Sequence, residues 1–110
     1  MEDRRKFQRI PLQLSARYLV GNKKEWFNCS IINISRDGKG IKVYLQEKIS
    51  PGLILKFKII VSKKVEPIET SGILRWSKKL QEEMAFIGGV ELLNKDSEET
   101  RTLLDYAYGS

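Results

Sequence analysis

The first ten residues of this chain contain three arginines whose side chains could bind an anion. Arg5 and Arg9 are separated by three residues, and Arg4 stands directly before them. A guanidinium stays charged at physiological pH and offers its donors in a planar fork, which the ammonium of a lysine lacks. The segment therefore predicts an arm that attracts phosphates, acidic lipids or acidic protein surfaces. Taken alone, a basic N-terminus is more often a solvated tail.

A second polar cluster lies at residues 33–38, which read Asn-Ile-Ser-Arg-Asp-Gly. The Asn33 amide can donate and accept hydrogen bonds, and Ser35 offers a hydroxyl. Gly38 permits a positive φ and a close approach of the backbone to a ligand, and Arg36 adds positive charge. We expect a tight loop that grips polar edges of a ligand. Alone, such a segment is more typical of a plain β-turn whose Asn and Ser bond their own backbone.

The composition excludes most catalytic chemistry. The 110 residues include no His and one Cys, against 20 Lys plus Arg and 14 Asp plus Glu, for a net charge of +6. His is the usual general acid or base near neutral pH and the commonest metal ligand. We expect the single cysteine, Cys29, to be a buried small hydrophobic residue rather than a nucleophile. We therefore expect a protein that is not an enzyme and that has no metal and no cofactor.

The hydrophobic pattern predicts the elements that must position the arm and the loop. Apolar and polar residues alternate in six predicted strands: 12–20, about 26–32, from 41 onward, 53–61, 65–77 and 84–93. Six short strands separated by turns favour a mainly β fold, a small six-stranded antiparallel β-barrel with one C-terminal α-helix. We expect a single domain made of a flexible basic arm (1–10), the barrel (11–95) and the helix (96–110).

The predicted helix begins at a capping box, because Asp96 is followed three residues later by Glu99. Its apolar face consists of residues at helical spacing, namely Thr100, Leu103, Leu104, Ala107 and Tyr108. We expect this face to pack against the sheet. Elsewhere, we expect four large aromatic residues to be core or edge residues rather than base-stacking platforms: Trp26, Phe57, Trp76 and Phe86.

Hairpin geometry brings the arm and the loop together. If the first two strands pair symmetrically about Lys23, Leu12 lies opposite Ile34 and Pro11 lies opposite Ser35. The arm and the loop then converge at one end of the barrel.

This combination resembles the PilZ domain, a bacterial receptor module for cyclic di-GMP. The RxxxR arm is present as Arg5 to Arg9, and the (D/N)xSxxG loop is present as Asn33 to Gly38. Residues 72–76 (GILRW) and 87–91 (IGGVE) are similar to the closing strands of the family, and the resemblance covers about residues 4–93. One departure is Lys39, where the family more often has an apolar or small residue.

The resemblance implies a receptor that binds cyclic di-GMP, a ligand with two phosphodiester charges and two guanines. We expect the arm to become ordered over this ligand and so to signal to an effector protein. An Arg fork can bond a phosphate or the O6/N7 edge of guanine. The implied ligand-binding residues belong to the two motifs: Arg4, Arg5, Arg9, Asn33, Ser35, Arg36 and Gly38.

Two alternatives remain open. A PilZ-like module could bind protein partners and no nucleotide, or a small basic barrel could bind single-stranded nucleic acid. The intact motifs argue against the first, and arginines gathered at one end rather than along a groove argue against the second. We expect a cytoplasmic protein without a membrane span, because the longest apolar run, Leu53 to Val61, is broken by Lys56 and Lys58.

Overall fold

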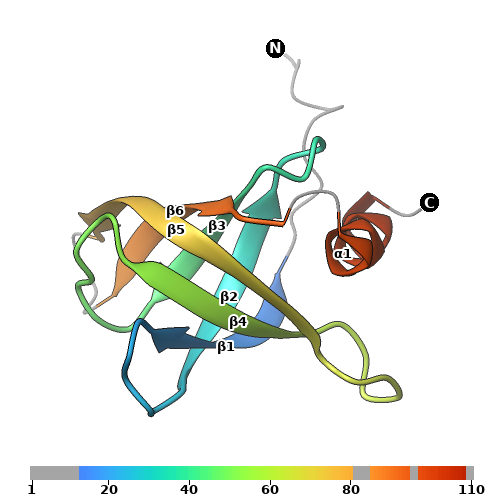
Figure 1. Cartoon of the computed structure of the whole chain (residues 1–110), viewed down its shortest axis with the longest axis horizontal. Helices are drawn as coiled ribbons and strands as arrows, with labels where there is room; N and C mark the ends of the chain where they lie inside the picture. Colours follow the sequence, from blue (N-terminus) through green and yellow to red (C-terminus); the bar gives the residue numbers. More distant parts are fainter. Residues whose placement is uncertain (1–12, 81–84, 95–96, 109–110) are drawn as a thin grey trace.

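Alternating apolar and polar residues produce an antiparallel β-barrel in the computed structural model, which describes residues 13–80, 85–94 and 97–108. The strands in this part of the chain are β1 (Leu14–Val20), β2 (Phe27–Ile34), β3 (Gly40–Leu45), β4 (Ile54–Ile60), β5 (Ile68–Lys79) and β6 (Phe86–Leu92). Helix α1 (Glu98–Tyr108) follows the last strand (Figure 1). The predicted fold class, a six-stranded antiparallel barrel with one C-terminal helix, is confirmed.

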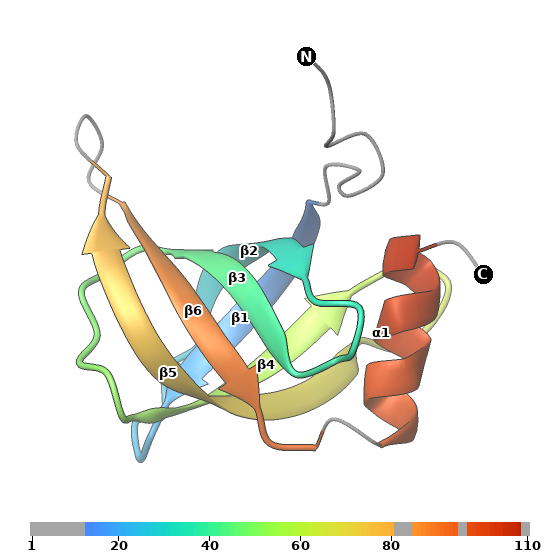
Figure 2. The ribbon, with the colours of Figure 1, turned by 90° about the horizontal axis from the view of Figure 1, so that it is seen from above.

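The strands close in the order β1-β2-β3-β6-β5-β4, and β4 pairs with β1 to complete the barrel. Closure satisfies the backbone hydrogen bonds that an open sheet exposes at its edges. Helix α1 lies beside the loop that joins β2 to β3 (Figure 2). The candidate loop is therefore flanked by the barrel and the helix.

The barrel interior is filled by apolar side chains from all six strands. The largest that are fully buried are Tyr18 and Phe57, joined by Leu103 from α1. Cys29 packs at the margin of this core, and burial raises the pKa of its thiol to about 12. The thiol is therefore protonated at neutral pH, in agreement with a hydrophobic rather than a nucleophilic role.

The register of the first hairpin differs by one residue from the prediction. Leu14 lies opposite Ile31 and Tyr18 opposite Phe27, so symmetric pairing about Lys23 is wrong. The backbone N–H of Lys23 donates to Val20 O at 2.9 Å and closes a tighter turn. This register places the rings of Tyr18 and Phe27 on one face, 5.7 Å apart, because directly opposed residues share a face. The predicted partners Pro11 and Leu12 lie outside the described residues.

The helix begins differently from the prediction as well. Ser97 is its N-cap, because its Oγ accepts a hydrogen bond from the backbone N–H of Thr100 at 3.2 Å. The Thr100 hydroxyl donates to Asn94 O at 2.7 Å, which ties the helix start to the end of β6. Asp96, the predicted cap, lies outside the described residues.

Candidate ligand-binding groove

A bulge in β2 turns Asn33 toward the outside of the barrel. Ile31 pairs with Val43, and the next pair is Asn33 with Lys42, so Ile32 is an extra residue. In a regular strand without the bulge, Asn33 would share the inward face of Ile31, because side chains alternate along a strand. The sequence predicts Asn33 in the loop, whereas the structure places it on β2 and leaves Ser35 as the first residue of the loop.

A second bulge, in β5, turns Trp76 toward the outside of the barrel. Leu74 pairs with Val90, and the next pair is Trp76 with Gly89, so Arg75 is the extra residue. Trp76 therefore leaves the buried face of Leu74, and it is 43% exposed. The expectation of a core or edge aromatic is wrong for this residue, since it lies on the outer face of a closed barrel.

With these two bulges, residues from four strands form one row on the outer face. Asn33 on β2 pairs with Lys42 on β3, Lys42 with Gly89 on β6, and Gly89 with Trp76 on β5. The indole of Trp76 lies directly over Gly89, where a Cβ would be 2.1 Å from Trp76 Nε1. Glycine at this position is therefore what allows the indole to lie against the sheet.

This row forms part of a groove with a volume of about 490 Å³. Its walls are the β2–β3 loop and the outer faces of β3, β5 and β6. The polar and aromatic side chains that line it are Asn33, Ser35, Asp37, Lys39, Lys42, Arg75, Trp76 and Glu91. A groove with one aromatic surface and several convergent polar groups is a typical ligand site.

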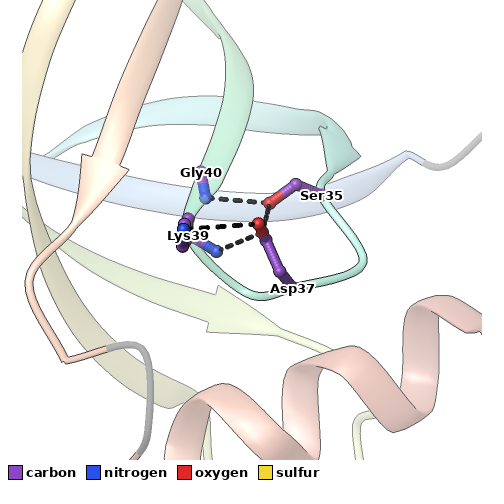
Figure 3. A network of polar contacts seen from close by, with 4 residues as sticks. All are labelled: Ser35, Asp37, Lys39 and Gly40. Carbon is purple, nitrogen blue, oxygen red and sulfur yellow. Dashed lines mark hydrogen bonds and ion pairs between the residues drawn. The ribbon is translucent and has the colours of Figure 1, made fainter.

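A network of hydrogen bonds within the loop holds its shape (Figure 3). Ser35 Oγ donates to Asp37 Oδ1 at 2.7 Å and accepts from the Gly40 backbone N–H at 3.0 Å. The Lys39 backbone N–H donates to the same Asp37 oxygen at 2.9 Å. Gly38 has a φ of 74°, a left-handed conformation that favours glycine. The hydroxyl of Ser35 is therefore committed to holding the loop.

The charges in the groove are only partly paired. Asp37 accepts the hydrogen bond from Ser35, which lowers the pKa of its carboxyl. Lys39 Nζ lies 4.0 Å from Asp37 Oδ2, and Arg75 Nη2 lies 2.6 Å from Glu91 Oε1. Lys42 has no carboxylate partner among the residues that the structure describes. Among the groove residues that the structure describes, its ammonium is the positive charge left available to an anion.

Some of the predicted site residues lie together at the groove, and one contacts the helix instead. Asn33 and Ser35 line the groove, and Gly38 supports the loop beside it. The guanidinium of Arg36 instead lies over the ring of Tyr108 on α1, 4.7 Å from its centroid. The three predicted residues of the arm, Arg4, Arg5 and Arg9, lie outside the described residues.

The sequence interpretation missed several groove residues. Lys42 could have been found, because it alternates with the apolar residues Ile41 and Val43 directly after the loop. Arg75 and Glu91 lie in segments that the resemblance already included, although no role was assigned to them. Glycine in a strand interior, as at Gly89, was the available signal for the close approach of another group.

Metal-binding clusters and membrane-spanning helices are both absent from the part of the chain that the structure describes. The described residues hold no group of three or more His, Cys, Asp or Glu side chains that could bind a metal ion. Within the same ranges, no helix is long and apolar enough to cross a membrane.

Comparisons with known proteins agree with this architecture. The model of the PilZ domain family matches residues 3–109. Among solved structures, the chain is similar to the Bacillus subtilis inhibitor of motility (MotI/DgrA), with 21% identity and a TM-score of 0.69. The similarity covers 98% of this chain and 51% of that one, so the chain spans about half its length. No curated protein matches. Because the family match extends from the arm through the barrel and the helix, the chain belongs to the PilZ domain family.

Proposed function

We propose that this protein is a non-enzymatic receptor for cyclic di-GMP and that the ligand binds in the groove beside the β2–β3 loop. The observation that carries the proposal is the outward row of Asn33, Lys42 and Trp76 beside the loop, in which two bulges turn Asn33 and Trp76 outward. The PilZ family, which is associated with this ligand and with effector proteins, supports the same conclusion.

The groove suits a nucleotide that carries flat bases. The exposed indole of Trp76 offers a surface on which a guanine can stack, and such contacts contribute about 1–3 kcal/mol per base. The half-buried side-chain amide of Asn33 lies in the same row and can donate to or accept from a base edge.

Positive charge for the phosphodiesters comes from two places. Lys42, between Asn33 and Gly89, supplies an ammonium inside the groove that no carboxylate of the described residues neutralises. We assign the remaining charge to Arg4, Arg5 and Arg9, whose forks can bond phosphate or the O6/N7 edge of guanine. The arm precedes β1 in the sequence, and the first residue of β1, Leu14, lies opposite Ile31, two residues before Asn33 on β2.

The signal, in this proposal, is an ordering of residues 1–10 over the bound nucleotide, which creates a new surface for an effector protein. The similar structure is named an inhibitor of motility, so a motility component is one class of partner to test. Secretion and polysaccharide-synthesis components are the others. Hydrogen exchange of residues 1–10 should slow when ligand binds, and unchanged exchange would contradict this mechanism.

The binding proposal is tested by isothermal titration of cyclic di-GMP at moderate salt. We expect micromolar or tighter binding by the wild type and loss of binding by the double variant Arg5→Ala/Arg9→Ala. Arg17→Ala is the matched control, because Arg17 is an exposed arginine on β1 that does not line the groove. A wild type that binds no cyclic di-GMP would contradict the proposal and favour a PilZ module that recognises protein alone.

Single-stranded nucleic acid remains the other alternative, and the same preparation tests it. Binding whose affinity rises with oligonucleotide length and falls steeply with salt would favour that function. A groove that binds only a compact dinucleotide should show no rise in affinity with oligonucleotide length.

A further inference from the structure

A carboxylate in the groove needs an explanation, because the proposed ligand carries two negative charges. Glu91 lines the groove on the outer face of β6, and its side chain is 53% exposed. An acidic group at a site for a dianion weakens binding through repulsion unless it is neutralised or accepts hydrogen bonds from the ligand.

Arg75 neutralises Glu91 and fixes its position. Its Nε and Nη2 atoms both lie 2.6 Å from Oε1 of Glu91. An exposed ion pair of this kind adds little to stability, about 0–1 kcal/mol. The bulge in β5 provides the arginine of this pair, since Arg75 is the bulged residue and lines the groove. Both contacts fall on one carboxylate oxygen, so Oε2 remains able to accept further hydrogen bonds.

The position of Glu91 suits the edge of a base that stacks on Trp76. The indole lies over Gly89, and Gly89 and Glu91 are two residues apart on the same face of β6. Alternate residues of a strand are separated by roughly 6.6 Å, about the width of a purine. A purine on the indole would therefore direct one edge toward the carboxylate.

The chemistry of that edge distinguishes guanine from adenine. Guanine presents two donors on its Watson–Crick edge, N1–H and the N2 amino group, and either of them can donate to the free Oε2 of Glu91. Adenine presents one donor and, at N1, one acceptor whose lone pair repels a carboxylate.

We propose that Glu91, oriented by Arg75, accepts hydrogen bonds from the Watson–Crick edge of a guanine and thereby selects guanine over adenine. This inference rests on the proposed function, because it assigns the base specificity of the same groove. Glu91 contacts the ligand directly, and Arg75 acts as a positioning residue.

The test is the affinity ratio of cyclic di-GMP to cyclic di-AMP, measured by titration calorimetry for the wild type and for Glu91→Gln. A glutamine amide offers one acceptor and one donor, which fit adenine better than guanine. We expect the ratio to fall roughly tenfold or more, through weaker binding of cyclic di-GMP and stronger binding of cyclic di-AMP.

The control is Glu69→Gln, which removes the same charge from the exposed face of β5 outside the groove. This variant should leave the ratio unchanged. If Glu91→Gln strengthens the binding of both dinucleotides equally, Glu91 acts only through its charge and the inference is overturned. The inference also fails if the wild type binds cyclic di-GMP and Glu91→Gln keeps the wild-type ratio. Wild-type protein that binds neither dinucleotide would instead contradict the proposed function itself.

Discussion

The residues of the motif at positions 33–38 have different roles in the structure. Asn33 belongs to a strand and faces the groove, while Ser35 uses its hydroxyl to join Asp37 and the backbone of Gly40. Arg36 leaves the groove and lies over Tyr108. The motif therefore combines a ligand-facing amide with a hydroxyl that holds the loop.

Removal of the Ser35 hydroxyl should change the pKa of the Asp37 carboxyl. The hydrogen bond from Ser35 is the first cause of the lowered pKa of Asp37, followed by the bond from the Lys39 backbone. A carboxyl whose pKa is lowered on folding stabilises the fold above its ordinary pKa, about 3.9, and this stabilisation is lost as the pH falls through the lowered value. In Ser35→Ala, the pKa of Asp37 should rise toward its ordinary value, as followed by NMR titration of the carboxyl.

A matched control for this titration is Ser62→Ala, which removes a similar hydroxyl that accepts from the Lys64 backbone in another turn. It should leave the titration of Asp37 unchanged. A Ser35→Ala protein in which Asp37 titrates at the wild-type pH would show that the hydrogen bond does not hold the loop in solution.

At the scale of the elements, the C-terminal end of α1 contacts the candidate loop and the end of β2. The hydroxyl of Tyr108 donates to the backbone carbonyl of Ile34, the last residue of β2, and its ring carries the guanidinium of Arg36. At the other end of the helix, Thr100 is bonded to the segment after β6. The helix therefore connects the end of β6 with the loop that lines the groove.

Removal of the Tyr108 hydroxyl should weaken this connection. We expect Tyr108→Phe to lower the free energy of unfolding by about 1 kcal/mol, because the hydrogen bond to the Ile34 carbonyl is lost while the ring remains under Arg36. The melting temperature should fall by roughly 4–8 °C. Hydrogen exchange should become faster in the last turn of α1 and in residues 35–39.

Tyr106→Phe provides the comparison, because Tyr106 lies on the same helix and is 47% exposed, and it is Tyr108 whose hydroxyl bonds the end of β2. This variant should melt at the wild-type temperature. Equal melting temperatures for Tyr108→Phe and the wild type would mean that the helix end is not fastened in solution.

The elements also show what could be predicted from sequence. Alternation predicted the six strands, because each strand has one buried face, and apolar residues at helical spacing predicted the helix. The bulge at Arg75 could not be seen, since Leu74, Arg75 and Trp76 alternate as a regular strand would and place Trp76 inside. In β2 a signal was present, because Ile31 and Ile34 are three residues apart and cannot share a face without an extra residue.

At the scale of the whole molecule, the core and the groove occupy opposite faces of the same strands. Val43 and Val90 are buried in the interior, whereas their neighbours Lys42 and Glu91 face the groove. The pairing of the chain's own strands, with β4 against β1, closes the barrel. Ligand binding should therefore add to the stability of a complete fold rather than create it.

The stability of the whole barrel should accordingly rise with ligand concentration. A ligand that binds only the folded state at a hundred times its Kd raises the free energy of unfolding by about 2.7 kcal/mol. We expect thermal unfolding of the wild type to shift upward accordingly with cyclic di-GMP. Arg5→Ala/Arg9→Ala should show no shift, and a shift of equal size in that variant would mean that the arm is not needed for binding.

The separation of core and groove has a consequence for how this site can evolve. Substitutions at Asn33, Lys42 or Trp76 change outward side chains and leave the packing of the interior intact. New ligand preferences can therefore arise one residue at a time, without the loss of folding that accompanies changes inside a core. The same barrel can give rise to descendants that differ in what they recognise while they keep an unchanged interior.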